Sequence, residues 1–129
     1  MIITEHFTET ESGITVPKTA DLVRLCEDRI RELRKYTEAH LQHVMPKTRL
    51  LFDLKGKVAG TANSGKGVIR INYVLLKENT EHFIKQTLGH EYAHLITDSL
   101  WLSNLISKPT AHGQGWKKVM RQLGLTPDR

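Results

Sequence analysis

The pentapeptide His90-Glu91-Tyr92-Ala93-His94 constrains the fold of this chain more than any other feature of its sequence. Residues four apart face the same side of an α-helix, so both imidazoles can reach one metal ion only if the segment is helical. Zn²⁺ binds neutral imidazole nitrogen, and a catalytic zinc site keeps one position for water. Glu91 lies too close to His90 along the helix to bind the same ion, but its carboxylate can accept a proton from that water. The pattern predicts a helix that carries a metal site, with Glu91 as the general base.

A third metal ligand has to come from elsewhere in the chain. No glutamate follows Glu91, and the residues after His94 lack the Gly and His of an HExxHxxGxxH pattern. Asp98 continues the histidine stripe, but an unbroken helix would place it about 6 Å along the axis from His94. His112 lies in a Gly-rich turn that could fold back beside the helix, and histidine makes the more usual catalytic zinc set. We favour His112 as the third ligand and expect Asp98 to be a capping group or to support a ligand.

The first half of the chain predicts one long helix followed by three strands. Thr19 or Asp21 can cap the helix and Pro46 stops it. Its apolar residues recur at helical spacing: Leu22, Leu25, Cys26, Ile30, Leu33, Leu41 and Val44. Residues 49–54, 57–62 and 67–73 then read as strands separated by short turns. Because connections this short join antiparallel neighbours, we expect a small antiparallel three-stranded sheet.

The remaining segments complete a single α+β domain over residues 1–129. Asn79 or Thr80 is expected to cap the helix that carries the pentapeptide, which runs through Ile96. A C-terminal helix follows Gly115 and ends at Gly124. Residues 1–17 show no clear period, so we expect an irregular N-terminal segment.

Composition narrows the class of protein further. The N-terminus lacks the basic start and apolar run of a signal peptide, and no segment is apolar enough to span a bilayer, so we expect a cytoplasmic protein without membrane contact. The single cysteine, Cys26, excludes an internal disulfide and is expected to be a buried structural thiol. The formal charge of +5 is compatible with an anionic partner such as DNA and also with solvated helix faces.

Several other residues have simpler interpretations. His82, His40 and His43 are expected at the surface. Trp116 and Met120 are expected to pack behind the His112 turn. Asn72, at the end of the third strand, either bonds near the site or shapes the turn, and Tyr92 faces away from the histidines by one helical step.

The combination of motifs resembles the SprT-like zinc metallopeptidases. The resemblance runs through Ile71-Asn72 with Leu75-Leu76, the pentapeptide with Leu95, Pro109 to Met120, and Leu123-Gly124. In that family an HGxxWKxxM turn and helix follow the HExxH helix, and the histidine of the turn completes the zinc site. His112 matches that position, and Trp116, Lys117 and Met120 match the helix after it. The resemblance covers roughly residues 20–126.

This resemblance implies a zincin-like fold and a zinc-dependent endopeptidase that hydrolyses protein substrates. Relatives of the Spartan type degrade proteins crosslinked to DNA, which makes DNA a second expected partner. We expect no Cys-rich zinc ribbon after the core, and we therefore expect any DNA contact to come from the basic surface of the core itself. The alternative is a catalytically silent, zinc-stabilised module that binds nucleic acid or protein. Glu91 argues against that alternative, because a purely structural zinc site needs no base.

Overall fold

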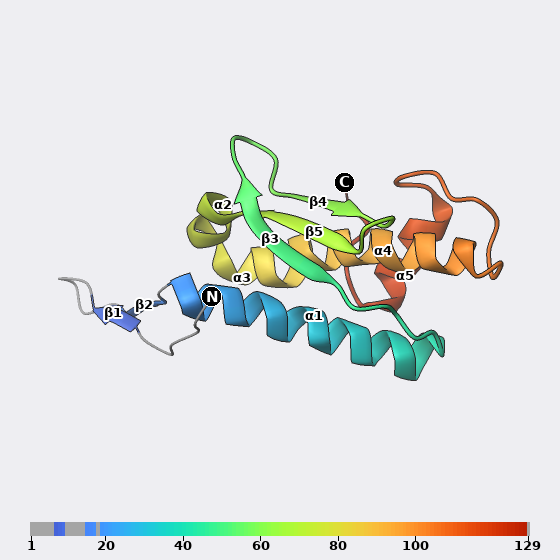
Figure 1. The fold of residues 1–129 in the computed structure, drawn as a ribbon, viewed down its shortest axis with the longest axis horizontal. Coiled ribbons are helices and arrows are strands. Elements are labelled where there is room, and N and C mark those ends of the chain that lie inside the picture. The colour runs from blue at the N-terminus through green and yellow to red at the C-terminus, as the bar shows by residue number, and fades with distance from the viewer. Residues whose placement is uncertain (1–6, 10–14, 18, 129) are drawn as a thin grey trace.

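The computed structural model describes residues 7–9, 15–17 and 19–128. Strands β1 (Phe7–Glu9) and β2 (Thr15–Pro17) form an antiparallel pair, so part of the segment that we expected to be irregular is β-structure. Helix α1 (Thr19–Leu41) follows. The sheet then consists of β3 (Arg49–Leu54), β4 (Gly60–Asn63) and β5 (Val68–Asn72). Figure 1 shows the sheet on one side of the central helix α4 and α1 on the other.

The sheet is mixed, which corrects the expected antiparallel sheet. Its strand order is β3-β5-β4, with β5 antiparallel to β4 but parallel to β3. Short connections constrain only strands that are consecutive and paired, and β3 does not pair with β4. Strand β5 is the most buried of the three and pairs on both sides, so residues 55–59 carry the chain across its end to the far edge. Strand β4 is therefore an edge strand.

Asn72 holds this crossing in place. Its side-chain amide donates hydrogen bonds to the carbonyls of Gly56 (3.0 Å) and Val58 (3.1 Å). Its side-chain oxygen accepts from the backbone N–H of Leu75 and so caps α2 (Tyr73–Glu78), a helix that we did not expect. The residue is 1% exposed, so these bonds satisfy a buried amide. Asn72 shapes the turn and lies apart from the histidines.

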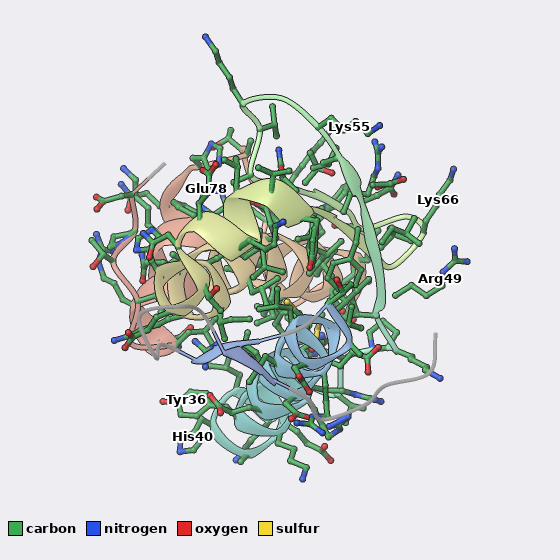
Figure 2. The ribbon with its side chains drawn as sticks, turned by 90° about the vertical axis from the view of Figure 1, so that its left-hand side faces the viewer. Tyr36, His40, Arg49, Lys55, Lys66 and Glu78 are labelled. Atoms are coloured by element: carbon green, nitrogen blue, oxygen red, sulfur yellow. The ribbon has the colours of Figure 1, made fainter. Side chains whose placement is uncertain are left out.

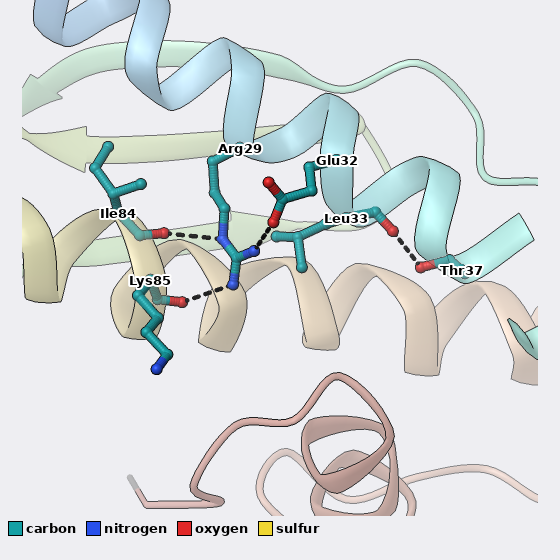
Figure 3. Close-up of polar contacts among 6 residues, drawn as sticks. All are labelled: Arg29, Glu32, Leu33, Thr37, Ile84 and Lys85. Atoms are coloured by element: carbon teal, nitrogen blue, oxygen red, sulfur yellow. Dashed lines mark hydrogen bonds and ion pairs between the residues drawn. The ribbon is translucent and has the colours of Figure 1, made fainter. Parts of the chain in front are cut away.

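A nearly continuous helical segment follows α2. It comprises α3 (Thr80–His82), the π-helical turn η1 (Phe83–Thr87) and α4 (Leu88–Leu102). The expected start at Thr80 is confirmed, although the side chain of Asn79 makes no capping hydrogen bond. A π turn departs from the α-helical bonding pattern, and Arg29 of α1 donates to the carbonyls of Ile84 and Lys85 within it, each at 3.2 Å. Figure 3 shows these bonds together with the Arg29–Glu32 ion pair.

Helix α1 is shorter than its apolar pattern suggested. It ends at Leu41 because Gln42 adopts a left-handed conformation with φ of 51°. Val44, which we expected on its apolar face, is 65% exposed. The Thr37 hydroxyl donates to the carbonyl of Leu33 inside the helix (Figure 3). Helix α1 therefore ends before Pro46, the residue that we expected to stop it.

The core lies between α1, α4, α5 (Gln114–Gln122) and the inner face of the sheet. Cys26 is fully buried, as expected, and burial raises the pKa of its thiol to about 12. Trp116 and Met120 are also fully buried, which confirms their packing role. The arrangement is α+β. No helix in the part of the chain that the structure describes is long and apolar enough to cross a membrane.

Candidate metal centre

Three histidine rings from two separate segments converge at one point. His90 and His94 lie one turn apart on α4, and His112 comes from the loop between α4 and α5. Their Nε2 atoms are 3.3 Å apart for His90–His94 and 3.2 Å apart for each of the other two pairs. A tetrahedral zinc ion bound to nitrogen at 2.0–2.1 Å requires ligand nitrogens about 3.3 Å from one another. The three rings therefore fit a single Zn²⁺ ion without rearrangement.

Trp116 contacts all three histidine rings. Its indole stacks on His94 at an interplanar angle of 18° and meets the rings of His90 and His112 edge-on, with centroids 4.7 and 4.8 Å away. Its Nε1–H donates to the backbone carbonyl of His90 at 3.3 Å. A metal site depends on such supporting contacts because they fix the orientation of each ligand ring. Trp116 is therefore a positioning residue as well as part of the core.

The two α4 histidines are held in the neutral form that a metal requires. The pKa of His94 is lowered to about 4, chiefly by burial and then by the neighbouring His90 and His112, while Asp98 acts in the opposite direction. Burial also lowers the pKa of His90, and the neighbouring His112 lowers it further. A hydrogen bond with the backbone of Asp128 acts in the opposite direction and raises this pKa. Neutral imidazole is the zinc-binding form, so protons compete weakly for this site at neutral pH.

Glu91 lies beside the histidine cluster and outside it. Its Oε2 is 3.7 Å from Nε2 of His90, and the residue is 8% exposed. Burial raises the pKa of its carboxyl group to about 7. A carboxyl group with a pKa near the working pH can both take up and release a proton. A divalent cation held by the histidines would oppose this rise by favouring the carboxylate.

The edge strand approaches Glu91 closely at Gly60. A Cβ atom at this position would lie 3.2 Å from Cγ of Glu91, so the absence of a side chain permits the contact. Sequence reasoning missed Gly60, although a glycine inside a strand is the usual signal of a close backbone approach. It also missed the C-terminal tail, in which Leu125 packs against Gly89 next to His90. No periodic pattern marks that contact.

The histidine cluster lies where two cavities meet. Gly60, His90 and Glu91 line both of them. The first cavity, of about 510 Å³, follows β4 and continues toward Asp98 and the segment Pro109–Ala111. The second, of about 480 Å³, leads toward Lys57, His82 and Asp128. Together they form a cleft with an arm on each side of the site, which we call the Asp98 arm and the Lys57 arm.

Comparison with known proteins identifies the family of this chain. The model of the SprT-like family matches residues 30–128, which include all three histidines and Glu91. The chain belongs to the SprT-like family. No solved structure is significantly similar to it.

Curated SprT-like relatives come from several pseudomonads. Protein SprT of Pseudomonas paraeruginosa is 37% identical over 102 residues, which cover 78% of this chain and 59% of that protein. Protein SprT of Pseudomonas putida strain GB-1 is 32% identical over 106 residues, which cover 81% and 62%. This chain thus spans about three fifths of the length of the curated relatives that it matches.

Asp98 and the other histidines that the structure describes, His40, His43 and His82, lie outside the cluster in this SprT-like chain. His82 is exposed on the Lys57 arm, and His40 is exposed against Tyr36. The expected surface position of His43 is wrong: the ring is 9% exposed, and its Nε2 is 2.8 Å from the hydroxyl oxygen of Ser99. Because α1 ends early, the chain turns back and presents this ring to α4. Asp98 is not among the residues whose ligand atoms form the candidate metal site.

Proposed function

We propose that this protein is a zinc-dependent endopeptidase that hydrolyses peptide bonds of protein substrates. The observation that carries the proposal is the convergence of three Nε2 atoms within 3.2–3.3 Å of one another, with the Glu91 carboxylate 3.7 Å from one of them. His90, His94 and His112 would hold the ion in a zincin-like site. Three protein ligands leave one coordination position for water, which a structural zinc site closes with a fourth residue.

Glu91 is the proton carrier of this proposal. Bound Zn²⁺ would polarise the scissile carbonyl and lower the pKa of water toward about 7. Glu91 takes the proton of the attacking water and passes it to the amine nitrogen as the peptide bond breaks. The group changes protonation state twice in each cycle: burial, which raises its pKa, favours uptake of the proton, and a bound cation, which opposes that rise, favours its release. The contact with Gly60 limits the positions that the Glu91 side chain can occupy.

Edge strand β4 is the element that we expect to bind the substrate backbone. Its residues Gly60, Thr61 and Ala62 line the cleft, and an edge strand offers a row of backbone groups to an extended peptide. Antiparallel addition gives the better hydrogen-bond geometry of the two directions. A peptide bound in this way passes over the histidine cluster with residues in both arms.

Cleavage of casein by the zinc-loaded protein tests the proposal. We expect wild type to cleave and Glu91→Gln to lose at least about 100-fold in rate while retaining zinc and fold. Glu38→Gln, an exposed substitution on α1, is the matched control and should cleave like wild type. A wild-type protein that binds zinc and cleaves neither casein nor unfolded peptides would contradict the proposal. The silent zinc-stabilised module would then be the better account.

A second candidate activity is DNA binding by the surface beside β3. Four basic residues line a groove of about 420 Å³ between α1 and the start of β3: Arg31, Arg34, Lys47 and Arg49. Figure 2 shows Arg49 and Lys66 projecting outward on the same side of the molecule. Such a groove can hold phosphates by releasing counterions.

DNA binding at this groove predicts a strong dependence on salt. DNA should stimulate casein cleavage at low salt, and Arg49→Glu should weaken DNA binding about tenfold while Lys77→Glu, outside the groove, has little effect. Fluorescence anisotropy with a labelled oligonucleotide measures the affinity. Equal binding by both variants would contradict this groove as the DNA site.

A further inference from the structure

The Asp98 arm of the cleft carries negative charge in a protein of formal charge +5. Among the residues that the structure describes, its charged lining side chains are those of Glu91 and Asp98, and no Lys or Arg lines it. The opposite arm shares Glu91 and also contains Asp128, but Lys57 and His82 line it as well. The cleft is therefore electrostatically asymmetric about the histidine cluster, and a bound peptide meets a different charge on each side of its scissile bond.

Asp98 is the carboxylate at the far end of its arm. It lies one helical turn beyond His94 on α4 and is half-buried. The hydroxyl of Ser64, just after β4, donates a hydrogen bond to its Oδ2 atom. Among residues 19–128, no Lys or Arg side chain forms an ion pair with Asp98. The carboxylate is thus held in place by Ser64 and faces the cavity without a cationic partner from the described part of the chain.

The direction of β4 determines which part of a substrate reaches Asp98. The strand runs from Gly60, in contact with Glu91, to Asn63, which precedes Ser64. An antiparallel substrate runs the opposite way. Its residues on the N-terminal side of the scissile bond therefore lie along the part of β4 that leads to Asp98, and its C-terminal residues lie in the Lys57 arm.

We propose that Asp98 determines specificity by binding a Lys or Arg side chain on the N-terminal side of the scissile bond. This inference rests on the proposed peptidase function and names its preferred substrate class. A cationic side chain in this arm would form a charge-assisted hydrogen bond with a half-buried carboxylate, which is stronger than a bond between neutral groups. An acidic side chain at the same position would be repelled by Asp98.

A purely structural role for Asp98 predicts a different result. In that case the Ser64–Asp98 bond serves only to hold the turn after β4 against α4. Loss of the carboxylate would then impair cleavage of all peptides to the same extent. The ratio of kcat/KM between two peptides separates the two roles, because a structural defect cancels from the ratio.

The test uses internally quenched peptides that differ only by Lys, Gln or Glu at positions N-terminal to the cleavage site. We expect wild type to prefer Lys over Gln about tenfold at one such position, Asp98→Asn to bring the ratio near one, and Asp98→Lys to favour Glu. Asp28→Asn, an exposed substitution on α1, is the matched control and should keep the wild-type ratio. A wild-type ratio near one, or an unchanged ratio in Asp98→Asn, overturns the assignment while the peptidase proposal stands.

A binding measurement decides the case in which no peptide is cleaved, which is the failure of the proposed function. Fluorescence anisotropy of labelled Lys and Gln peptides is measured with the zinc-loaded wild type and Asp98→Asn. Tighter binding of the Lys peptide by about tenfold, lost in Asp98→Asn and kept in Asp28→Asn, supports Asp98 as the cation-binding group. Equal binding of the two peptides by wild type overturns it.

Discussion

Replacing Glu91 by Gln should stabilise the zinc-free protein at alkaline pH and not at acid pH. Burial raises the pKa of this carboxyl from 4.5 to about 7 in the folded state. The unfolded chain ionises near the ordinary value, so the folded state carries a penalty wherever the group is charged. At about 1.4 kcal/mol per pKa unit the full penalty is about 3 kcal/mol. The Gln amide is itself costly to bury, which reduces the expected gain to about 2 kcal/mol.

The sign of this effect fixes its pH window. A group whose pKa is raised on folding contributes stability below its unfolded pKa, and that contribution is lost as pH rises through the folded pKa. The advantage of Glu91→Gln over wild type should therefore be small near pH 4.5, grow between pH 4.5 and 7, and reach its full size by pH 8. Bound zinc should shrink the advantage, because a nearby cation favours the carboxylate.

Urea unfolding in the presence of a chelator measures the effect. A gain of about 2 kcal/mol moves the unfolding midpoint by about 1–2 M urea. Wild type, Glu91→Gln and the exposed control Glu38→Gln are compared at pH 4.5 and pH 8. Equal stability of wild type and Glu91→Gln at pH 8, or an equal gain at both pH values, would refute the view that Glu91 is ionised against a burial penalty.

Three further substitutions test the supports of the site. Gly60→Ala places a Cβ 3.2 Å from Cγ of Glu91, so we expect about a tenfold lower kcat with zinc content unchanged; an unaltered kcat would show that the contact is unimportant. Trp116→Phe removes the hydrogen bond to the carbonyl of His90 and should weaken zinc binding about tenfold in a chelator competition, whereas unchanged affinity would count against this support. Asn72→Ala removes three hydrogen bonds of a buried amide and should lower the free energy of unfolding by about 2–4 kcal/mol, and a loss below about 1 kcal/mol would contradict its role at the crossing.

The parts of the site that follow local periodicity could be predicted from the sequence. Helical spacing alone places His90 and His94 on one face, and the structure brings them together. The position of His112 depends on how a loop folds back, which helical spacing cannot give. The Gly-rich turn and the family resemblance together pointed to it. The closeness of Gly60 and the support from the C-terminal tail are tertiary contacts that leave almost no local pattern.

The errors in the fold also have a tertiary origin. We expected an antiparallel sheet because short turns join neighbouring strands. In the structure β5 lies between β3 and β4, so these two consecutive strands do not pair. Strand β5 takes the central position because residues on both of its faces are buried. This burial exists only in the assembled domain, so no local pattern predicts it. The early end of α1 depends on one residue, Gln42, which adopts a left-handed backbone conformation. The sequence does not predict that conformation. The buried position of His43 follows from that turn.

Zinc content of purified variants tests the central claim most directly. Metal analysis is performed on wild type, His112→Ala, Asp98→Ala and His82→Ala, the last a matched histidine control outside the cluster. The account predicts one zinc per chain in wild type, Asp98→Ala and His82→Ala, and its loss in His112→Ala. Absence of zinc from wild type, or full retention by His112→Ala with loss in Asp98→Ala, would contradict it.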